Sequence, residues 1–142
     1  MGHFITGVVD EILTPFNADG TVNYEQTAEM IDWHLSKGIQ NFFVNGLGAE
    51  CHELTTEEKL ELLKVIYGRT QGKAKIMACS FENSIEENKK LLDLYEETGM
   101  ADCYCITAPP FFRHTQKALY DYAAELIDYA KRPVYIYNCV QM

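Results

Sequence analysis

Short apolar runs alternate with longer amphipathic stretches along the whole chain. Each apolar run is too short to form a buried helix, so these runs predict strands. The predicted strands are residues 7–13, 39–45, 75–79, 103–107 and 134–138. Asp10 and Glu11 interrupt the apolar character of the first strand.

The stretches between the strands carry apolar residues at helical spacing and predict four amphipathic helices. Their boundaries are marked by N-capping residues and by glycines. The start signals are Asn23 with Gln26, Thr55 with Glu58, and Ser84 with Glu87, and the stop signals are Gly38 and Gly99. The fourth helix, about 115–130, has the most regular stripe, formed by Leu119, Tyr122, Ala123, Leu126, Ile127 and Ala130. A strand followed by a capped helix therefore repeats four times.

This repeat is typical of βαβ units and predicts an α/β fold with a parallel sheet and right-handed crossovers. Two architectures fit. One is an open, flavodoxin-like doubly wound sheet. The other is the first part of an eight-stranded (β/α) barrel, which has about 250 residues when complete. At 142 residues, with no linker-like segment, residues 1–142 are expected to form a single domain.

The segment 42–58 is the centre of this organisation, because it joins a strand to a helix through a glycine-containing turn. The turn itself is Gly46, Leu47, Gly48, Ala49 and Glu50. In parallel α/β proteins, ligands bind at the loops that follow the carboxyl ends of the strands. The turn is therefore the first candidate binding site.

Composition removes several classes of function. The formal net charge of −9 argues against nucleic acid and against anionic membranes as partners. No apolar run is long enough to span a bilayer, and the first residues lack the pattern of a secretion signal. The five cysteines lack the spacing of a disulfide framework and fit a reducing, cytoplasmic location.

The order of the loop motifs decides between the two architectures. Thr14-Pro15-Phe16 follows the first strand, a Gly-x-x-(Gly/Ala)-Glu turn follows the second, and Leu54-Thr55-x-Glu-Glu comes after that turn. Pro110 and two aromatic residues follow the fourth strand, and Tyr137-Asn138 ends the fifth. In this order the chain resembles the amino-terminal half of the dihydrodipicolinate synthase and N-acetylneuraminate lyase family. That resemblance implies a truncated TIM barrel, or half-barrel.

The resemblance also implies an activity. Members of this family condense or cleave pyruvate and other 2-oxo acids through a lysine Schiff base. Gly46 to Glu50 match the turn that holds the pyruvate carboxylate, and Tyr137 matches a tyrosine that relays protons, a role that suits a phenol. Phe111 and Phe112 match a tyrosine pair of which one hydroxyl joins that relay across a subunit interface.

The departures from the family pattern all affect residues to which the family assigns a chemical role. Leu47 and Gly48 replace a pair of hydroxyl-bearing residues, and Phe111 and Phe112 carry no hydroxyl. The Schiff-base lysine belongs to the strand after the fifth, and none of the nine lysines here ends a predicted strand. Lys75 begins one, at the opposite end of the sheet. We therefore expect this chain to be inactive by itself, and a Schiff base to need an amine from elsewhere.

Several residues have a second interpretation. Tyr137 could be a half-buried strand tyrosine without a proton-relay role, and Gly46 and Gly48 could serve a tight turn with positive φ. Glu50 is expected to orient the turn by accepting backbone N–H groups. One of Asp10 and Glu11 is expected to point into the sheet interior and to need a partner there.

The cysteines raise the question of a metal site. Cys51, Cys79 and Cys139 each follow a predicted strand, and His52 adjoins Cys51, so a zinc site is conceivable. The spacing matches no ligand signature, and free cysteines are usually small buried apolar residues. We therefore predict no metal and no cofactor. Arg113 and His114 could hold an acidic substrate or could simply be solvated.

A half-barrel leaves two strand edges and an apolar inner sheet face without partners. We therefore predict association, either as a homo-oligomer or with a complementary carboxyl-terminal half. The functional prediction is a carbon–carbon lyase of the aldolase type acting on a 2-oxo acid. The alternative is a non-catalytic half-barrel that binds a small acid or a partner.

Overall fold

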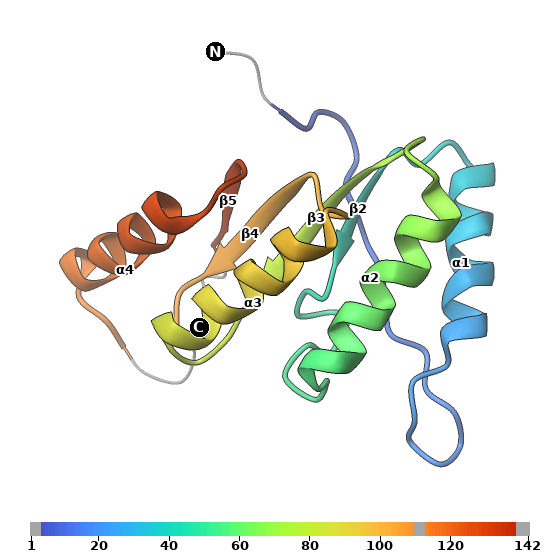
Figure 1. Cartoon of the computed structure of the whole chain (residues 1–142), viewed down its shortest axis with the longest axis horizontal. Helices are drawn as coiled ribbons and strands as arrows, with labels where there is room; N and C mark the ends of the chain where they lie inside the picture. Colours follow the sequence, from blue (N-terminus) through green and yellow to red (C-terminus); the bar gives the residue numbers. More distant parts are fainter. Residues whose placement is uncertain (1–3, 110–112, 139–142) are drawn as a thin grey trace.

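The computed structural model describes residues 4–109 and 113–138, and it has the repeated strand–helix order that the sequence predicts (Figure 1). The strands are β1 (Asp10–Glu11), β2 (Asn41–Val44), β3 (Lys75–Ser80), β4 (Cys103–Thr107) and β5 (Val134–Tyr137). The helices are α1 (Tyr24–Ser36), α2 (Thr56–Thr70), α3 (Ile85–Thr98) and α4 (Gln116–Tyr129).

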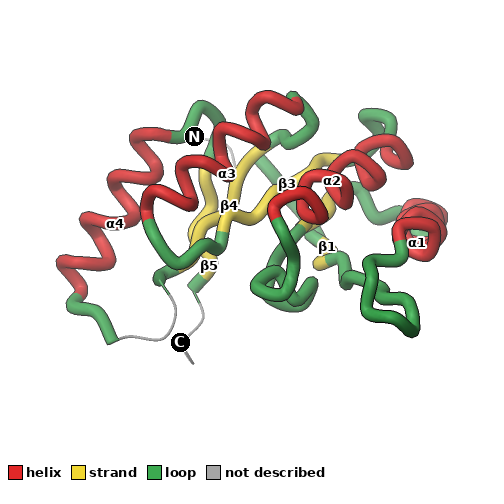
Figure 2. Tube along the Cα trace, turned by 60° about the horizontal axis from the view of Figure 1, so that its bottom comes forward, coloured by secondary structure: helices red, strands yellow, loops and turns green. Residues whose placement is uncertain are grey.

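The five strands form one parallel sheet in the order β1-β2-β3-β4-β5. The helices follow the same order, and all four lie on one side of the sheet (Figure 2). A doubly wound sheet reverses its strand order at a switch point and carries helices on both faces. The flavodoxin-like alternative is therefore wrong, and the half-barrel is confirmed.

The first strand is much shorter than the predicted 7–13. Only Asp10 and Glu11 pair with β2, opposite Phe42 and Phe43. Gly7 has a positive φ of 86°, which breaks the extended chain before β1. The segment before the strand is held instead by Asn41, whose Nδ2 donates to the carbonyls of Thr6 at 3.0 Å and Val8 at 2.9 Å.

The helix starts agree with the capping signals. Thr55 and Glu58 form a complete capping box, with each side chain bonded to the backbone N–H of the other. Asn23 and Ser84 each accept the N–H three residues on. These bonds satisfy N–H groups that have no partner within the helix, so each helix begins where its cap lies.

The larger core lies between the sheet and the helices. It contains outward-facing strand residues and the buried stripes of α1, α2 and α3. Its fully buried members include Ile31, Phe42, Leu63, Ile76, Tyr95 and Tyr104. The stripe predicted for α4 is only partly buried, because Leu126 is its one fully buried residue and Ile127 is 41% exposed. Part of the apolar stripe of α4 is therefore exposed.

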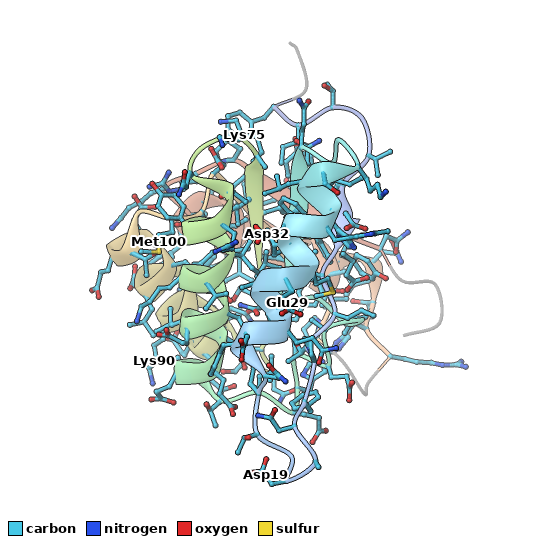
Figure 3. The ribbon with its side chains drawn as sticks, turned by 90° about the vertical axis from the view of Figure 1, so that its right-hand side faces the viewer. Asp19, Glu29, Asp32, Lys75, Lys90 and Met100 are labelled. Carbon is cyan, nitrogen blue, oxygen red and sulfur yellow. The ribbon has the colours of Figure 1, made fainter. Side chains whose placement is uncertain are left out.

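Ion pairs between neighbouring helices reinforce this layer. Arg69 of α2 donates to Asp32 of α1, and Figure 3 shows Asp32 on the face of α1 that is turned toward α2. Lys75 lies at the amino-terminal edge of the sheet, at the far end of the molecule from Asp19 (Figure 3). Its amine pairs with Asp102 at 2.7 Å. The prediction that Lys75 starts a strand, at the end opposite the loop motifs, is thus correct.

The other face of the sheet, which we call the inner face, carries a second apolar cluster. Its buried members are Ile5, Phe43, Cys51, Met77, Cys79, Phe81, Cys103 and Cys105. Register explains the set, since Phe43, Met77 and Cys103 are successive partners across three strands, as are Cys79, Cys105 and Tyr135. Among the described residues, no helix is long and apolar enough to cross a membrane.

Candidate active site

Asn45, the residue directly after β2, anchors the turn that follows this strand. This residue is buried and has a positive φ of 60°, a conformation that asparagine tolerates better than most residues. Its Nδ2 donates to the carbonyl of Lys59 at 3.1 Å and to the hydroxyl of Tyr95 at 2.9 Å. The chain therefore leaves the sheet at a fixed point and in a fixed direction.

The turn is then closed by its own backbone and by Thr14. The N–H of Glu50 donates to the carbonyl of Leu47 at 3.0 Å. The Thr14 hydroxyl donates to the carbonyl of Ala49 at 2.8 Å, and both residues are buried. Thr14 belongs to the Thr-Pro-Phe motif after the first strand, so that motif holds the turn of the next strand. Sequence reasoning identified the motif but not this contact.

The glycines of the turn are not there for positive φ. The residues of this segment with positive φ are Asn45 and Glu50, at 60° and 56°, and not Gly46 or Gly48. A side chain is excluded at both positions because there is no room for a Cβ. A Cβ at Gly46 would collide with the Phe43 ring and a Glu11 oxygen, and one at Gly48 would lie 2.9 Å from Glu11 Cδ. The prediction of a tight turn with positive φ at the glycines is therefore wrong, and close approach is the reason for both.

The carboxylate that orients the turn belongs to Glu11. The Gly48 N–H donates to Glu11 Oε1 at 2.7 Å, a length typical of a bond to a charged acceptor. Glu50, for which this role was predicted, is exposed, and its backbone N–H and C=O make the turn contacts. The neighbouring Asp10 points to the helix side and pairs with His34. One of the two acidic residues thus does face the interior, as predicted, and each has a partner.

Tyr137 is the last residue of β5 and is half-buried on the inner face. Its ring packs against two other aromatic rings, with centroid distances of 6.0 Å to Phe43 and 5.6 Å to Phe81. Phe43 in turn contacts Phe81 at 6.2 Å and lies against Gly46. Tyr137 and the turn therefore lie at the same, carboxyl-terminal end of the sheet, linked through the Phe43 ring. The interpretation of Tyr137 as a half-buried strand residue fits, and its chemical role remains a prediction.

Leu47 is half-buried and packs against the inner-face cluster. It therefore adds apolar surface to the turn, where the hydroxyl-bearing residue of the resemblance would add a donor. Ala49 is buried beneath the turn, and Gly48 is exposed. Among the five turn residues, the Gly48 N–H is the group that meets a carboxylate.

The thiols of the inner face are buried and weakly acidic. Burial raises the pKa of Cys51 to about 11, with the charges of Glu82 and Glu11 adding to the rise and that of Lys59 opposing it. Burial likewise raises the pKa of Cys103 to about 12. The pKa of Cys79 is also raised by burial, and then by its neighbour Cys105. These three thiols are therefore protonated at neutral pH and are poor nucleophiles.

The zinc site considered from the sequence would involve Cys51, His52, Cys79 and Cys139. No group of three or more His, Cys, Asp or Glu side chains within residues 4–109 and 113–138 is arranged to hold a metal ion. Cys139 lies outside the described residues. His52 is exposed beside the buried Cys51.

Other candidates lie at or beyond the limits of the described chain. Phe111 and Phe112, the pair matched to two tyrosines, lie outside the described residues. Arg113 and His114 are exposed. Their predicted alternatives, an acid-binding role or simple solvation, stay open.

A family model decides the relationship of the chain to known proteins. The model described as "Dihydrodipicolinate synthetase family" matches residues 4–141. The chain belongs to this family. The resemblance read from the loop motifs is therefore confirmed, and it covers nearly the whole chain.

Individual members of the dihydrodipicolinate synthetase family are similar but distant. The 4-hydroxy-tetrahydrodipicolinate synthase of Methylibium petroleiphilum is 29% identical over 134 residues, which are 94% of this chain and 45% of that protein. The crystal structure of dihydrodipicolinate synthase from Aquifex aeolicus has a TM-score of 0.88 at 28% identity and covers 96% of this chain and 46% of that one. The chain thus spans about half the length of these relatives.

Two further structures extend the comparison. The chloride-inhibited dihydrodipicolinate synthase of Acinetobacter baumannii, solved with pyruvate, has a TM-score of 0.88 at 26% identity, covering 94% of this chain and 45% of that one. The N-acetylneuraminate lyase of Mycoplasma synoviae has a TM-score of 0.82 at 24% identity, covering 94% of this chain and 47% of that one, and shares the fold. Both enzyme types of the family that the loop motifs resemble, the synthases and the lyases, are therefore represented among the similar structures.

Proposed function

We propose that this chain forms the amino-terminal half of a carbon–carbon lyase site that handles pyruvate or another 2-oxo acid. The observation that carries the proposal is the position of Tyr137. Its phenol-bearing ring lies at the carboxyl-terminal end of the inner face, packed on the Phe43 ring that borders Gly46. A proton-relaying phenol and the glycine-containing turn then share one end of the half-barrel, where barrel enzymes bind substrates.

The amine for a Schiff base comes, in this proposal, from a complementary carboxyl-terminal half. Lys59 is the one fully buried lysine among residues 4–109 and 113–138, and its Nζ is 2.5 Å from Glu82 Oε1. Lys75 lies at the other edge of the sheet. An amine that is held in a buried ion pair is poorly placed to attack a carbonyl, so we assign the nucleophile to the other half.

Two exposed surfaces support a partner of this kind. Beside β5, a cavity of about 270 Å³ lies between the sheet and α4 and is lined by residues that include Ile106, Leu119, Ala123 and Ile136. Ile136 is 58% exposed there. At the opposite edge, beside β1, Val8 is 68% exposed. Further strand–helix units would cover both, and a second copy of the chain is the alternative occupant.

The known relatives support the substrate class. The Acinetobacter baumannii synthase was solved with pyruvate, and this chain shares its fold over the matching half. We extend that acid to this chain as part of the proposal. A cytoplasmic location also belongs to the proposal, since the four described cysteines are free and buried and a reducing compartment keeps thiols in that state.

The second candidate is a non-catalytic half-barrel that serves association. It is favoured by the filling of the inner face, where Phe43, Phe81 and Tyr137 pack on one another and Glu11 occupies the turn amide. Side chains of the protein itself thus fill space that a substrate would need. This candidate predicts association without any chemistry.

Borohydride trapping with pyruvate, measured by intact mass, separates the candidates. The chain is tested alone and after co-expression with the carboxyl-terminal half of the Methylibium petroleiphilum relative, with that full-length relative as positive control. We expect no adduct on the chain alone and an adduct on the added half in the complex, formed more slowly when Tyr137→Phe is introduced.

Two results would count against the lyase proposal. A complex that forms but never traps pyruvate would favour the non-catalytic candidate. An adduct on the isolated chain that disappears in Lys59→Met, but not in Lys75→Met, would move the nucleophile into this half.

A further inference from the structure

The Glu11 carboxylate contacts the turn to which the proposed function assigns an acid ligand. Glu11 belongs to β1 and reaches across the inner face to the turn after β2, 37 residues further along the chain. There it accepts the Gly48 N–H at 2.7 Å. A carboxylate is thus already bound to the exposed amide of the turn.

The turn is shaped around this carboxylate. A Cβ at Gly48 would lie 2.9 Å from Glu11 Cδ and 3.0 Å from Oε2, and a Cβ at Gly46 would meet Oε1. Both glycines thus leave room for one internal side chain. A hydroxyl-bearing residue at position 48 could not coexist with Glu11 in this position, which gives a physical reason for the missing donor.

The charge of Glu11 is not neutralised by a cation. None of the described Lys, Arg or His side chains forms an ion pair with it, whereas Asp10 next to it pairs with His34 on the other side of the sheet. The charge of Glu11 also contributes to the raised pKa values of Cys51 and Cys79, after burial and nearer groups. The Gly48 N–H is therefore its main stabilising contact, and an incoming acid would meet a negative charge.

We propose that Glu11 is an internal competitor for the carboxylate of an acid ligand. The turn holds a small external carboxylate only when the Glu11 side chain is displaced or removed. Glu11 thereby determines which acids the site accepts, because an acid must outcompete a carboxylate held at high effective concentration by the fold. This inference deepens the proposed function and rests on it for the identity of the natural acid.

The test uses acetate as the probe and the Gly48 amide as the reporter. Acetate has a carboxylate but no ketone, so it cannot form a Schiff base. The ¹⁵N–¹H resonance of Gly48 is followed in the unsubstituted chain and in Glu11→Ala, with Glu11→Gln as a variant of the same shape without charge. Asp10→Asn is the matched control, since it changes the adjacent carboxylate on the opposite face.

In the absence of acetate, Glu11→Ala is expected to move the Gly48 amide proton upfield and to speed its hydrogen exchange about tenfold. Asp10→Asn leaves both unchanged. On titration, acetate is expected to shift the Gly48 resonance of Glu11→Ala saturably. Its affinity for the unsubstituted chain is expected to be at least about tenfold lower. Glu11→Gln is expected to have an intermediate affinity for acetate, because its neutral amide oxygen bonds to the Gly48 N–H less strongly than a carboxylate does.

Three results would overturn the proposal. The Gly48 resonance could stay in place on removal of Glu11, acetate could bind equally to both forms, or acetate could fail to bind to Glu11→Ala and Glu11→Gln alike. The outcome is independent of the lyase proposal. Acetate binding to Glu11→Ala, combined with a complex of the two halves that forms but never traps pyruvate, would uphold the competitor and reject the lyase proposal.

Discussion

The backbone N–H of Gly48 donates to the carboxylate of Glu11, and this bond joins the first strand to the turn after the second. The Glu11 carboxylate also explains Gly48, and together with the Phe43 ring it explains Gly46, since each glycine lacks a Cβ where these groups lie. The candidate site of this family member is therefore occupied by one of its own side chains.

Energetic coupling between these two residues is the first prediction. Gly48→Ala places a Cβ 2.9 Å from Glu11 Cδ and must displace the carboxylate. We expect it to lower the free energy of unfolding by about 1.5–3 kcal/mol, the value of a hydrogen bond to a charged group. In the Glu11→Ala background the same substitution should cost close to nothing. Urea unfolding of the four proteins measures the coupling.

Gly68→Ala is the control for this cycle. Gly68 lies within α2, and a Cβ there would meet no atom within 4 Å. The substitution should stabilise the chain by up to about 1 kcal/mol in either background, because alanine is the better helix former. An equal cost of Gly48→Ala with and without Glu11 would contradict the contact.

Removal of the Tyr95 hydroxyl is the second prediction. This buried hydroxyl accepts from Asn45 Nδ2 at 2.9 Å and donates to the carbonyl of Cys79 at 3.0 Å. Tyr95→Phe leaves that carbonyl without its side-chain donor and should lower the free energy of unfolding by about 1–3 kcal/mol. Tyr120→Phe is the matched control, since Tyr120 is 73% exposed. Equal stabilities of the two variants in thermal or urea unfolding would refute this role of Tyr95.

Slow alkylation of the inner-face thiols is the third prediction. Burial raises the pKa of Cys51 to about 11 and that of Cys103 to about 12, so only a small fraction is thiolate near neutral pH. Iodoacetamide should label them slowly in the folded chain, with a rate that rises about tenfold per pH unit up to pH 9 or so. In urea all thiols should react quickly.

Intact mass after timed quenching gives the number of labelled thiols. Cys139 lies outside the described residues, so it is replaced by serine in all samples. A thiol in the Cys139→Ser chain that reacts in the folded state as fast as free cysteine would be inconsistent with the burial of this cluster.

The pH dependence of the Glu96 pair is the fourth prediction. The Arg132 guanidinium, and then the Tyr104 hydroxyl, lower the pKa of Glu96 below its ordinary value of 4.5. A lowered pKa in the folded state means that the pair stabilises the chain at pH above that ordinary value. The stabilisation is lost as the pH falls through the lowered value.

Glu96→Gln should therefore be less stable than the unsubstituted chain at about pH 7, and the difference should shrink in acid. Urea unfolding at several pH values measures it. Asp121→Asn is the control, because Asp121 forms an exposed pair with Lys117 within α4 and should have little effect at any pH. A constant difference for Glu96→Gln across the pH range would rule out the linkage.

Local signals in the sequence determined the order of the elements and the starts of the capped helices. The capping box of Thr55 and Glu58 uses groups three residues apart, so neighbouring residues contain all the information that sets the start of α2. The motif order likewise identified the family and the half-barrel, which the strand order then confirmed.

Strand register decided what the local pattern could not. Glu11 meets Gly48, and Thr14 meets Ala49, only because β1 pairs with β2 in one particular register. From the sequence we predicted positive φ at the glycines and the turn-orienting carboxylate at Glu50. A local pattern shows that a turn needs small residues and an acceptor, but it does not show which distant side chain contacts the turn. Those contacts join residues more than thirty positions apart, and only the folded sheet brings them together.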